Sequence, residues 1–238
     1  MNDDERALPV PAALRPWLSG LSVGGLDRER TVSDEPDHAT TLVLRTAPGH
    51  RGDLVVMGPR TRAGYHFGEP GPSCVKARIQ PGRAGALLGR SVRDLVDKVV
   101  PLSDFWGELP ETASPASFED LLLGQLAERR PPRDLVRDAA TLLTAVGVRD
   151  TALKLHVSER HLRTLFTDGV GVSPKHFARI DRVRTVLARA RTRDWARLAA
   201  EAGYYDHSHM TAEFRHLMGV SPSAFAAGEL PAATACGR

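Results

Sequence analysis

The feature that most constrains the fold of this chain is an internal repeat in its C-terminal part, with an offset of 48 residues. The tetrapeptide Gly-Val-Ser-Pro at 171–174 recurs at 219–222. Further positions match in the same register: Ala152 with Ala200, Ser158 with Asp206, Leu162 with Met210, Phe166 with Phe214, and Phe177 with Phe225. Apolar, capping and turn positions that agree in one register indicate a duplicated supersecondary unit.

Each copy predicts two helices joined by a tight turn. The first helix, 148–155 or 195–202, carries a small alanine where a second helix can cross closely. An N-cap residue, Ser158 or Asp206, then starts the second helix. The inward apolar faces of the second helices consist of Leu162, Leu165 and Phe166 in one copy and of Met210, Phe214 and Leu217 in the other. This arrangement is typical of the helix-turn-helix motif.

The opposite faces of the two second helices carry the candidate DNA-contacting residues. They are Arg160, Arg163, Thr164 and Thr167 in the first copy, and Ser208, Thr211, Ala212 and Arg215, with His207 beside them, in the second. Arginine can pair with a guanine edge, and threonine or alanine can contact a thymine methyl group. A solvated surface would explain one such face, but two capped helices with corresponding faces favour DNA binding.

The charge distribution agrees with a partner that carries phosphates. The formal net charge is +3, with a sequence pI of about 9.1. Residues 131–228 contain 15 Lys and Arg against 10 Asp and Glu, a net of +5, so the rest of the chain is at −2. Positive charge is therefore concentrated in the repeated part, as contacts with phosphates require.

These residues resemble the paired helix-turn-helix domain of the AraC/XylS family of bacterial transcription regulators. The resemblance extends from about residue 133 to 228 and rests on the segments 158–166 and 203–210, on Arg182 between them, and on the two Gly-Val-Ser-Pro turns. It implies two recognition helices in successive major grooves. A connecting helix over 174–190 would be roughly 24 Å long, which suits two readers about one helical turn, ~34 Å, apart.

The first copy departs from this family pattern in its scaffold helix. Leu155 stands where the second copy has the turn glycine Gly203, and the pair at 150–151 is Asp-Thr where the second copy has Leu-Ala at 198–199. In the second copy, Ala212 occupies a position that often carries a long polar reader in the family. We therefore expect the first unit, with Arg160 and Arg163, to provide most of the direct base discrimination.

The N-terminal part predicts a small β-rich domain. Runs rich in β-branched and aromatic residues at 41–45, 53–57, 62–67 and 74–79 alternate with Gly/Pro turns, which indicates an antiparallel sheet or barrel. Short helices are expected at 84–88 and, after the cap Ser91, at 92–99. A further helix, at 118–130, should begin at the cap Ser117. The segments 52–59, 81–88 and 99–107 resemble the N-terminal module of one AraC-like subgroup.

The chain as a whole is expected to have an α+β fold, with an all-α domain of two helix-turn-helix units joined by a long helix after the β-rich domain. The predicted divisions are 1–112 for the N-terminal sensing or assembly domain, 113–131 for a linker and helix, 132–228 for the DNA-binding domain, and 229–238 for a disordered tail. The mainly apolar stripe formed by Phe118, Leu121, Leu122, Gln125 and Leu126 could pack on its own domain or form a dimer seam.

Other function classes have weaker support in the sequence. An enzyme fused to such units, for example an alkyl-transfer repair protein, needs an activated cysteine, but Cys74 lies in an expected strand with no Cys or His close by. A β-barrel oxygenase needs clustered ligands, whereas His38, His50 and His66 are well separated. A third class, an architectural DNA-bending protein, would bind cognate and random DNA alike. We expect no enzyme activity, no cofactor and no metal.

The remaining expectations concern the surroundings of the protein. The only cysteines, Cys74 and Cys236, have no metal-finger spacing and fit a reducing cytoplasm. No run reaches the roughly 18 apolar residues of a membrane span, and the N-terminus lacks a signal-peptide pattern. Candidate partners are double-stranded DNA, a small-molecule or protein effector at the N-terminal domain, a second copy of the chain, and RNA polymerase if the protein is an activator.

Overall fold

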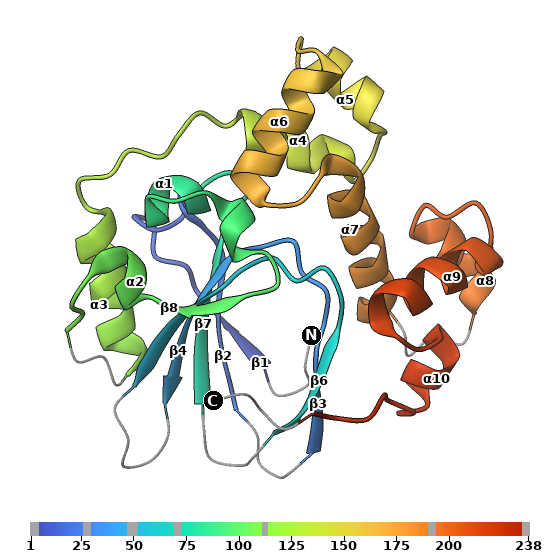
Figure 1. The fold of residues 1–238 in the computed structure, drawn as a ribbon, viewed down its shortest axis with the longest axis horizontal. Coiled ribbons are helices and arrows are strands. Elements are labelled where there is room, and N and C mark those ends of the chain that lie inside the picture. The colour runs from blue at the N-terminus through green and yellow to red at the C-terminus, as the bar shows by residue number, and fades with distance from the viewer. Residues whose placement is uncertain are drawn as a thin grey trace.

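The computed structural model describes residues 5–25, 30–46, 52–68, 73–110, 114–189 and 194–234. Figure 1 shows a β-rich N-terminal part and a set of helices that follows it in the chain, with the long helix α7 running between two helical groups. The expected α+β class, with a β-rich domain before two helix-turn-helix units, is confirmed. In the described part of the chain, no helix is long and apolar enough to cross a membrane.

The N-terminal domain is built on an antiparallel sheet of six strands in the order β1-β2-β7-β4-β5-β8. Its strands are β1 (Glu5–Leu8), β2 (Leu18–Gly25), β4 (Thr41–Thr46), β5 (Asp53–Met57), β7 (Ser73–Ile79) and β8 (Val99–Pro101). A separate two-stranded sheet pairs β3 (Arg30–Asp34) with β6 (Gly64–Gly68). The four strands expected from runs of β-branched and aromatic residues are confirmed as β4 to β7, whereas β1, β2, β3 and β8 were not predicted.

Four short helical segments cover this domain. They are α1 (Ala84–Leu88), the 3-10 helix η1 (Val92–Leu95), α2 (Ser103–Trp106) and α3 (Pro115–Leu126). Ser91 caps η1 as predicted, since its side chain accepts from the amide of Arg93. The helix expected over 92–99 is wrong in length, however, because it ends at Leu95 and Val99 begins strand β8. Helix α3 begins earlier than expected, because Ser114 and Ser117 form a reciprocal capping box with Ser114 as the N-cap.

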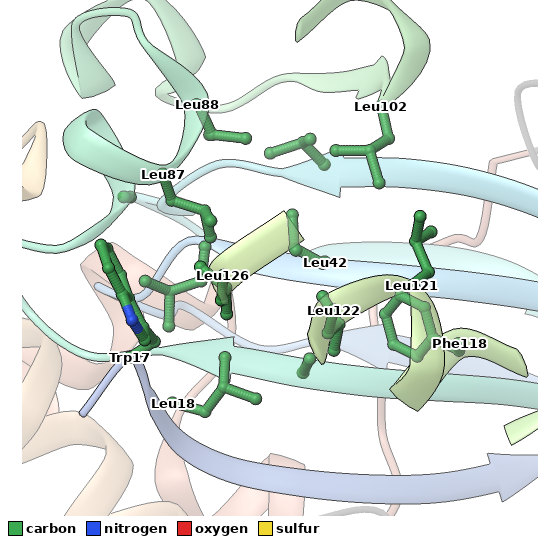
Figure 2. Close-up of a cluster of buried hydrophobic side chains, with 14 of the residues drawn as sticks. Trp17, Leu18, Leu42, Leu87, Leu88, Leu102, Phe118, Leu121, Leu122 and Leu126 are labelled. Carbon is green, nitrogen blue, oxygen red and sulfur yellow. The ribbon is translucent and has the colours of Figure 1, made fainter. Parts of the chain in front are cut away.

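The position of α3 decides between the two roles considered for its apolar stripe, packing on its own domain or forming a dimer seam. Phe118 and Leu122 are fully buried, and Figure 2 shows them in a cluster with Leu42 of the sheet and Leu102. The stripe therefore packs on its own domain and is not available as a dimer seam. Helix α3, which we expected within the segment of linker and helix at 113–131, is therefore part of the N-terminal core.

The C-terminal part consists of α4 (Leu135–Leu143), α5 (Val148–Lys154), α6 (Glu159–Val170), α7 (Pro174–Ala188), α8 (Trp195–Glu201), α9 (His207–Met218) and α10 (Pro222–Ala226). Two separate apolar cores, one in each helical group, surround Phe166 and Phe214. Residues 229–234 belong to the tail for which we expected disorder. They run back to the N-terminal domain, where the amide of Thr234 donates to the carbonyl of Tyr65 at 2.9 Å. Residues 235–238, with Cys236, lie outside the described part.

Candidate nucleic-acid interface

The first helical unit holds α6 by a cap at one end and a left-handed glycine at the other. The hydroxyl of Ser158 accepts from the amide of His161 at 3.1 Å, so it satisfies one of the free amides at the helix start. Gly171 ends the helix with a φ of 88°. Leu162 and Phe166 are buried, as the inward face predicted, and Leu165 is half-buried.

The second unit repeats this design around α9. A carboxylate oxygen of Asp206 accepts from the amide of His209 at 2.7 Å, and Gly219 ends the helix with a φ of 76°. The three residues predicted to face inward, Met210, Phe214 and Leu217, are all buried. Both predicted N-caps and both recognition helices are therefore present at the expected positions.

The turn between the two helices differs in length between the units, which corrects one part of the repeat register. The amide of Val157 donates to the carbonyl of Ala152, and the amide of Tyr204 donates to that of Ala199. The scaffold helices therefore correspond with an offset of 47 residues, so the structural counterpart of Ala152 is the buried Ala199 and not Ala200. The recognition helices keep the offset of 48, because the second turn contains one additional residue.

This correction also changes the position that corresponds to the turn glycine. Gly203 has a φ of 75°, and the residue in its place is His156, with a φ of 54°, and not Leu155. A left-handed conformation at a non-glycine residue is uncommon. The additional residue of the second turn is Tyr205, which is 93% exposed and directly precedes the N-cap of α9. Sequence reasoning missed this tyrosine because the ungapped register concealed the insertion.

The predicted reading face of α6 lies at the surface. Arg160, Arg163 and Thr164 are exposed and Thr167 is half-buried. Arg163 forms an ion pair with Glu159 at 2.8 Å, one turn earlier in the helix. The two threonine hydroxyls donate to carbonyls four residues back, at 3.1 and 2.7 Å. Of these four residues, only Arg160 has side-chain donors that form no hydrogen bond or ion pair with a described residue.

The predicted face of α9 is also exposed, but its side chains are shorter. His207, Ser208, Ala212 and Arg215 are exposed, and Thr211 is half-buried. The Thr211 hydroxyl lies 3.4 Å from Nε2 of His207. This face offers two ring nitrogens, hydroxyls and a methyl group near the start of the helix, and one guanidinium two turns later.

One acidic residue of α9 points inward. The side chain of Glu213 is only 6% exposed and forms ion pairs at 2.9 Å with both Arg179 and Arg182 of α7. Arg182 also lies over the ring of Tyr204, 5.1 Å from its centroid, and burial raises the pKa of that tyrosine. These contacts attach the second recognition helix to the connecting helix. The sequence signal, two arginines three residues apart in one helix and an inward glutamate in another, was present but not used.

Those residues considered for catalysis or metal binding that the structure describes do not assemble into a site. Burial raises the pKa of the Cys74 thiol, which opposes formation of a nucleophilic thiolate. His38 faces Asp181 and His66 faces Asp34, each as a single pair, and His50 lies outside the described residues. Within the described ranges, no group of three His, Cys, Asp or Glu side chains is suited to a metal ion.

Comparison with known proteins identifies the C-terminal part. Residues 151–228 match a family model described as a helix-turn-helix domain, which supports a DNA-binding transcription regulator. No curated protein matches the sequence.

Similar solved structures include an apo form of ToxT from Vibrio cholerae, with 11% identity over 87% of this chain and 96% of the other and a TM-score of 0.46. A second ToxT structure from Vibrio cholerae has 10% identity over 94% and 98%, with a TM-score of 0.44. A DNA-binding transcriptional dual regulator from Escherichia coli K-12 has 16% identity over 41% and 99%, with a TM-score of 0.35.

Proposed function

We propose that this chain, whose residues 151–228 form a helix-turn-helix domain of the AraC type, regulates transcription by inserting α6 and α9 into successive major grooves of its operator. The observation that carries the proposal is the pair of capped helices on the two sides of α7. Each has a reading face whose residues are exposed or half-buried. In the helix-turn-helix geometry, the residues near the start of the second helix contact base edges.

Arg160 is the main base reader in this proposal. It is exposed, lies in the first turn of α6 and has no ion-pair partner among the described residues. Arg163 is paired with Glu159 at 2.8 Å. To contact a base, its guanidinium must either keep this ion pair and donate with its remaining N–H groups, or break the pair. A guanidinium can donate two parallel hydrogen bonds to the O6 and N7 atoms of guanine, which is the commonest specific contact to a base.

The second unit contributes through shorter groups and through Tyr205. Ser208 and Ala212 are exposed but can make few paired hydrogen bonds, and Arg215 is far enough from the helix start for a phosphate contact. Tyr205 adds an exposed ring and a hydroxyl beside the N-cap, where tyrosine can donate to a phosphate oxygen. We assign base discrimination mainly to the first unit and backbone contacts mainly to the second.

We also propose that the N-terminal domain modulates this binding. A hollow of about 340 Å³ lies between η1, α2 and β8, and its lining includes four charged side chains and one aromatic ring: Arg90, Asp94, Lys98, Asp104 and Phe105. Helix η1 also contacts α6, since Arg93, which does not line the hollow, pairs with Asp168 at 2.8 Å. An effector bound in the hollow would therefore act on the first recognition helix across one short helix. A second copy of the chain and RNA polymerase remain candidate partners.

The test compares Arg160→Ala with wild type on duplexes that the wild-type chain selects from random sequence, and on scrambled duplexes of equal length, at two salt concentrations. Loss of a base contact should weaken cognate binding by about 1–3 kcal/mol and relax preference at one base pair. Arg149→Ala is the matched control, because Arg149 is exposed on the scaffold helix α5 and not on the reading face. Equal loss on both duplexes would instead assign Arg160 to the phosphate backbone.

A further inference from the structure

The N-terminal domain contacts the C-terminal end of the first recognition helix. Arg93 of η1 pairs with Asp168 in the last turn of α6. Gly171, which ends the helix, lies so close to η1 that a Cβ atom there would be 3.0 Å from the carbonyl oxygen of Val92. The end of α6 is thus packed against η1, while its reading face points elsewhere and stays exposed.

The same domain contacts the C-terminal end of the second recognition helix. The amide of Ala63 donates to the carbonyl of Leu217 at 2.8 Å, and the hydroxyl of Tyr65 donates to the carbonyl of Met218 at 2.6 Å. These are among the last carbonyls of α9, which have no partner within the helix. Burial raises the pKa of Tyr65 to about 12, so its hydroxyl remains a donor at neutral pH.

A third contact lies on the connecting helix between the two ends. The buried carboxylate of Asp37 pairs with Arg184 of α7 at 3.3 Å and also with Arg78 of the sheet. The ring of His38 packs on that of Phe177 with centroids 4.0 Å apart, and its Nε2 lies 3.7 Å from Asp181. The N-terminal domain therefore contacts α6, α7 and α9 at separate points.

We propose that these contacts fix the distance and angle between α6 and α9, so that the N-terminal domain determines which spacing between half-sites the protein accepts. The inference rests on the two-groove binding proposed above and assigns Ala63, Tyr65 and Arg93 as positioning residues. They hold the ends of the recognition helices and leave the reading faces uncovered, so they need not touch DNA.

Operator spacing is a sensitive measure of such positioning. One turn of DNA contains about 10–10.5 base pairs over ~34–36 Å, so inserting two base pairs both shifts the second half-site along the axis and rotates it about the axis. A second unit that is held in place cannot follow this displacement and loses its contacts. A unit released from the N-terminal domain can adjust and retain part of them.

The experiment uses the full chain and the duplex that wild type selects from random sequence, together with duplexes carrying two additional or two fewer base pairs between the half-sites. Ala63→Arg separates α9 from the N-terminal domain, because Ala63 packs against the core of the second unit. Tyr65→Phe removes only the hydroxyl. Arg62→Ala, the exposed neighbour, is the matched control for both. Arg93→Gln tests the contact to α6, with Arg6→Gln, at an exposed position of β1, as its control.

Wild type and both controls should lose at least about tenfold in affinity when the spacing changes, equivalent to the loss of one or two base contacts. Ala63→Arg should lose about threefold or less, since a second unit that is held only through α7 can follow part of the displacement. Tyr65→Phe and Arg93→Gln should fall between. Hydrogen exchange at the amide of residue 63 reports whether the second unit has separated. Separation without a change in spacing selectivity overturns the proposal. Failure of wild type to select any sequence contradicts the proposed function instead.

Discussion

Replacement of Glu213 should destabilise the second helix-turn-helix unit more than replacement of any exposed acidic residue. The carboxylate is 6% exposed and accepts from two guanidinium groups, both at 2.9 Å. Removal of one member of a buried ion pair typically costs 3–5 kcal/mol, because the partner charge stays buried without compensation. Arg179 and Arg182 are 26% and 30% exposed, so water can solvate them in part. We therefore expect the lower end, about 3 kcal/mol, for Glu213→Ala.

Glu213→Gln should cost less, about 1–2 kcal/mol, because the amide oxygen still accepts one charge-assisted hydrogen bond. The measurement is the free energy of unfolding from urea titrations of the full chain, followed by fluorescence of the three tryptophans, one of which, Trp195, lies in α8. Glu201→Ala is the matched control, since Glu201 also accepts from two arginines at 2.7 and 2.8 Å but lies at the surface. Equal destabilisation by Glu213→Ala and Glu201→Ala would refute the burial argument.

Three further predictions follow from the packing and the charges. Phe166→Ala and Phe214→Ala should each cost roughly 3–5 kcal/mol of unfolding free energy in thermal or urea melts, because both rings are fully buried; small shifts for both would contradict the assigned cores. Burial lowers the pKa of His38 below its ordinary 6.5, so its contribution to stability should be complete above pH 6.5 and decline as the pH falls below that value. His38→Gln should flatten this decline in pH-dependent melts. Elemental analysis of gently purified protein should find no stoichiometric transition metal; about one zinc or iron per chain would refute this.

The parts of the fold that sequence could predict are those determined by local chemistry. Ser158 and Asp206 are good N-caps in any context, because their side-chain oxygens reach the free amides of the following turn. The strands β4 to β7 were recognisable because β-branched residues alternate with Gly/Pro turns. The same reasoning found the buried Phe166 and Phe214 from helical periodicity alone.

Three features were not predicted, and two of them, the role of Glu213 and the place of α3, depend on contacts between distant segments. A single repeat register of 48 residues does not account for the one additional residue of the second turn, so no role was assigned to Tyr205. Glu213 was not singled out, because its role depends on Arg179 and Arg182 of another helix. The place of α3 in the N-terminal core likewise depends on the sheet that it covers.

The pairing of Glu159 with Arg163 suggests how the first unit can bind tightly without losing discrimination. The pair is exposed, so separating it in water costs at most about 1 kcal/mol. While the pair persists, the acidic group offsets one positive charge and weakens attraction to phosphates of any sequence. When Arg163 turns to a guanine edge, Glu159 is left in the strongly negative groove, and only a well-formed base contact compensates for that repulsion. In the proposed mode of binding, the acidic residue would thus penalise non-cognate DNA more than cognate DNA, whereas Arg160, which has no such partner among the described residues, would read its base without this penalty.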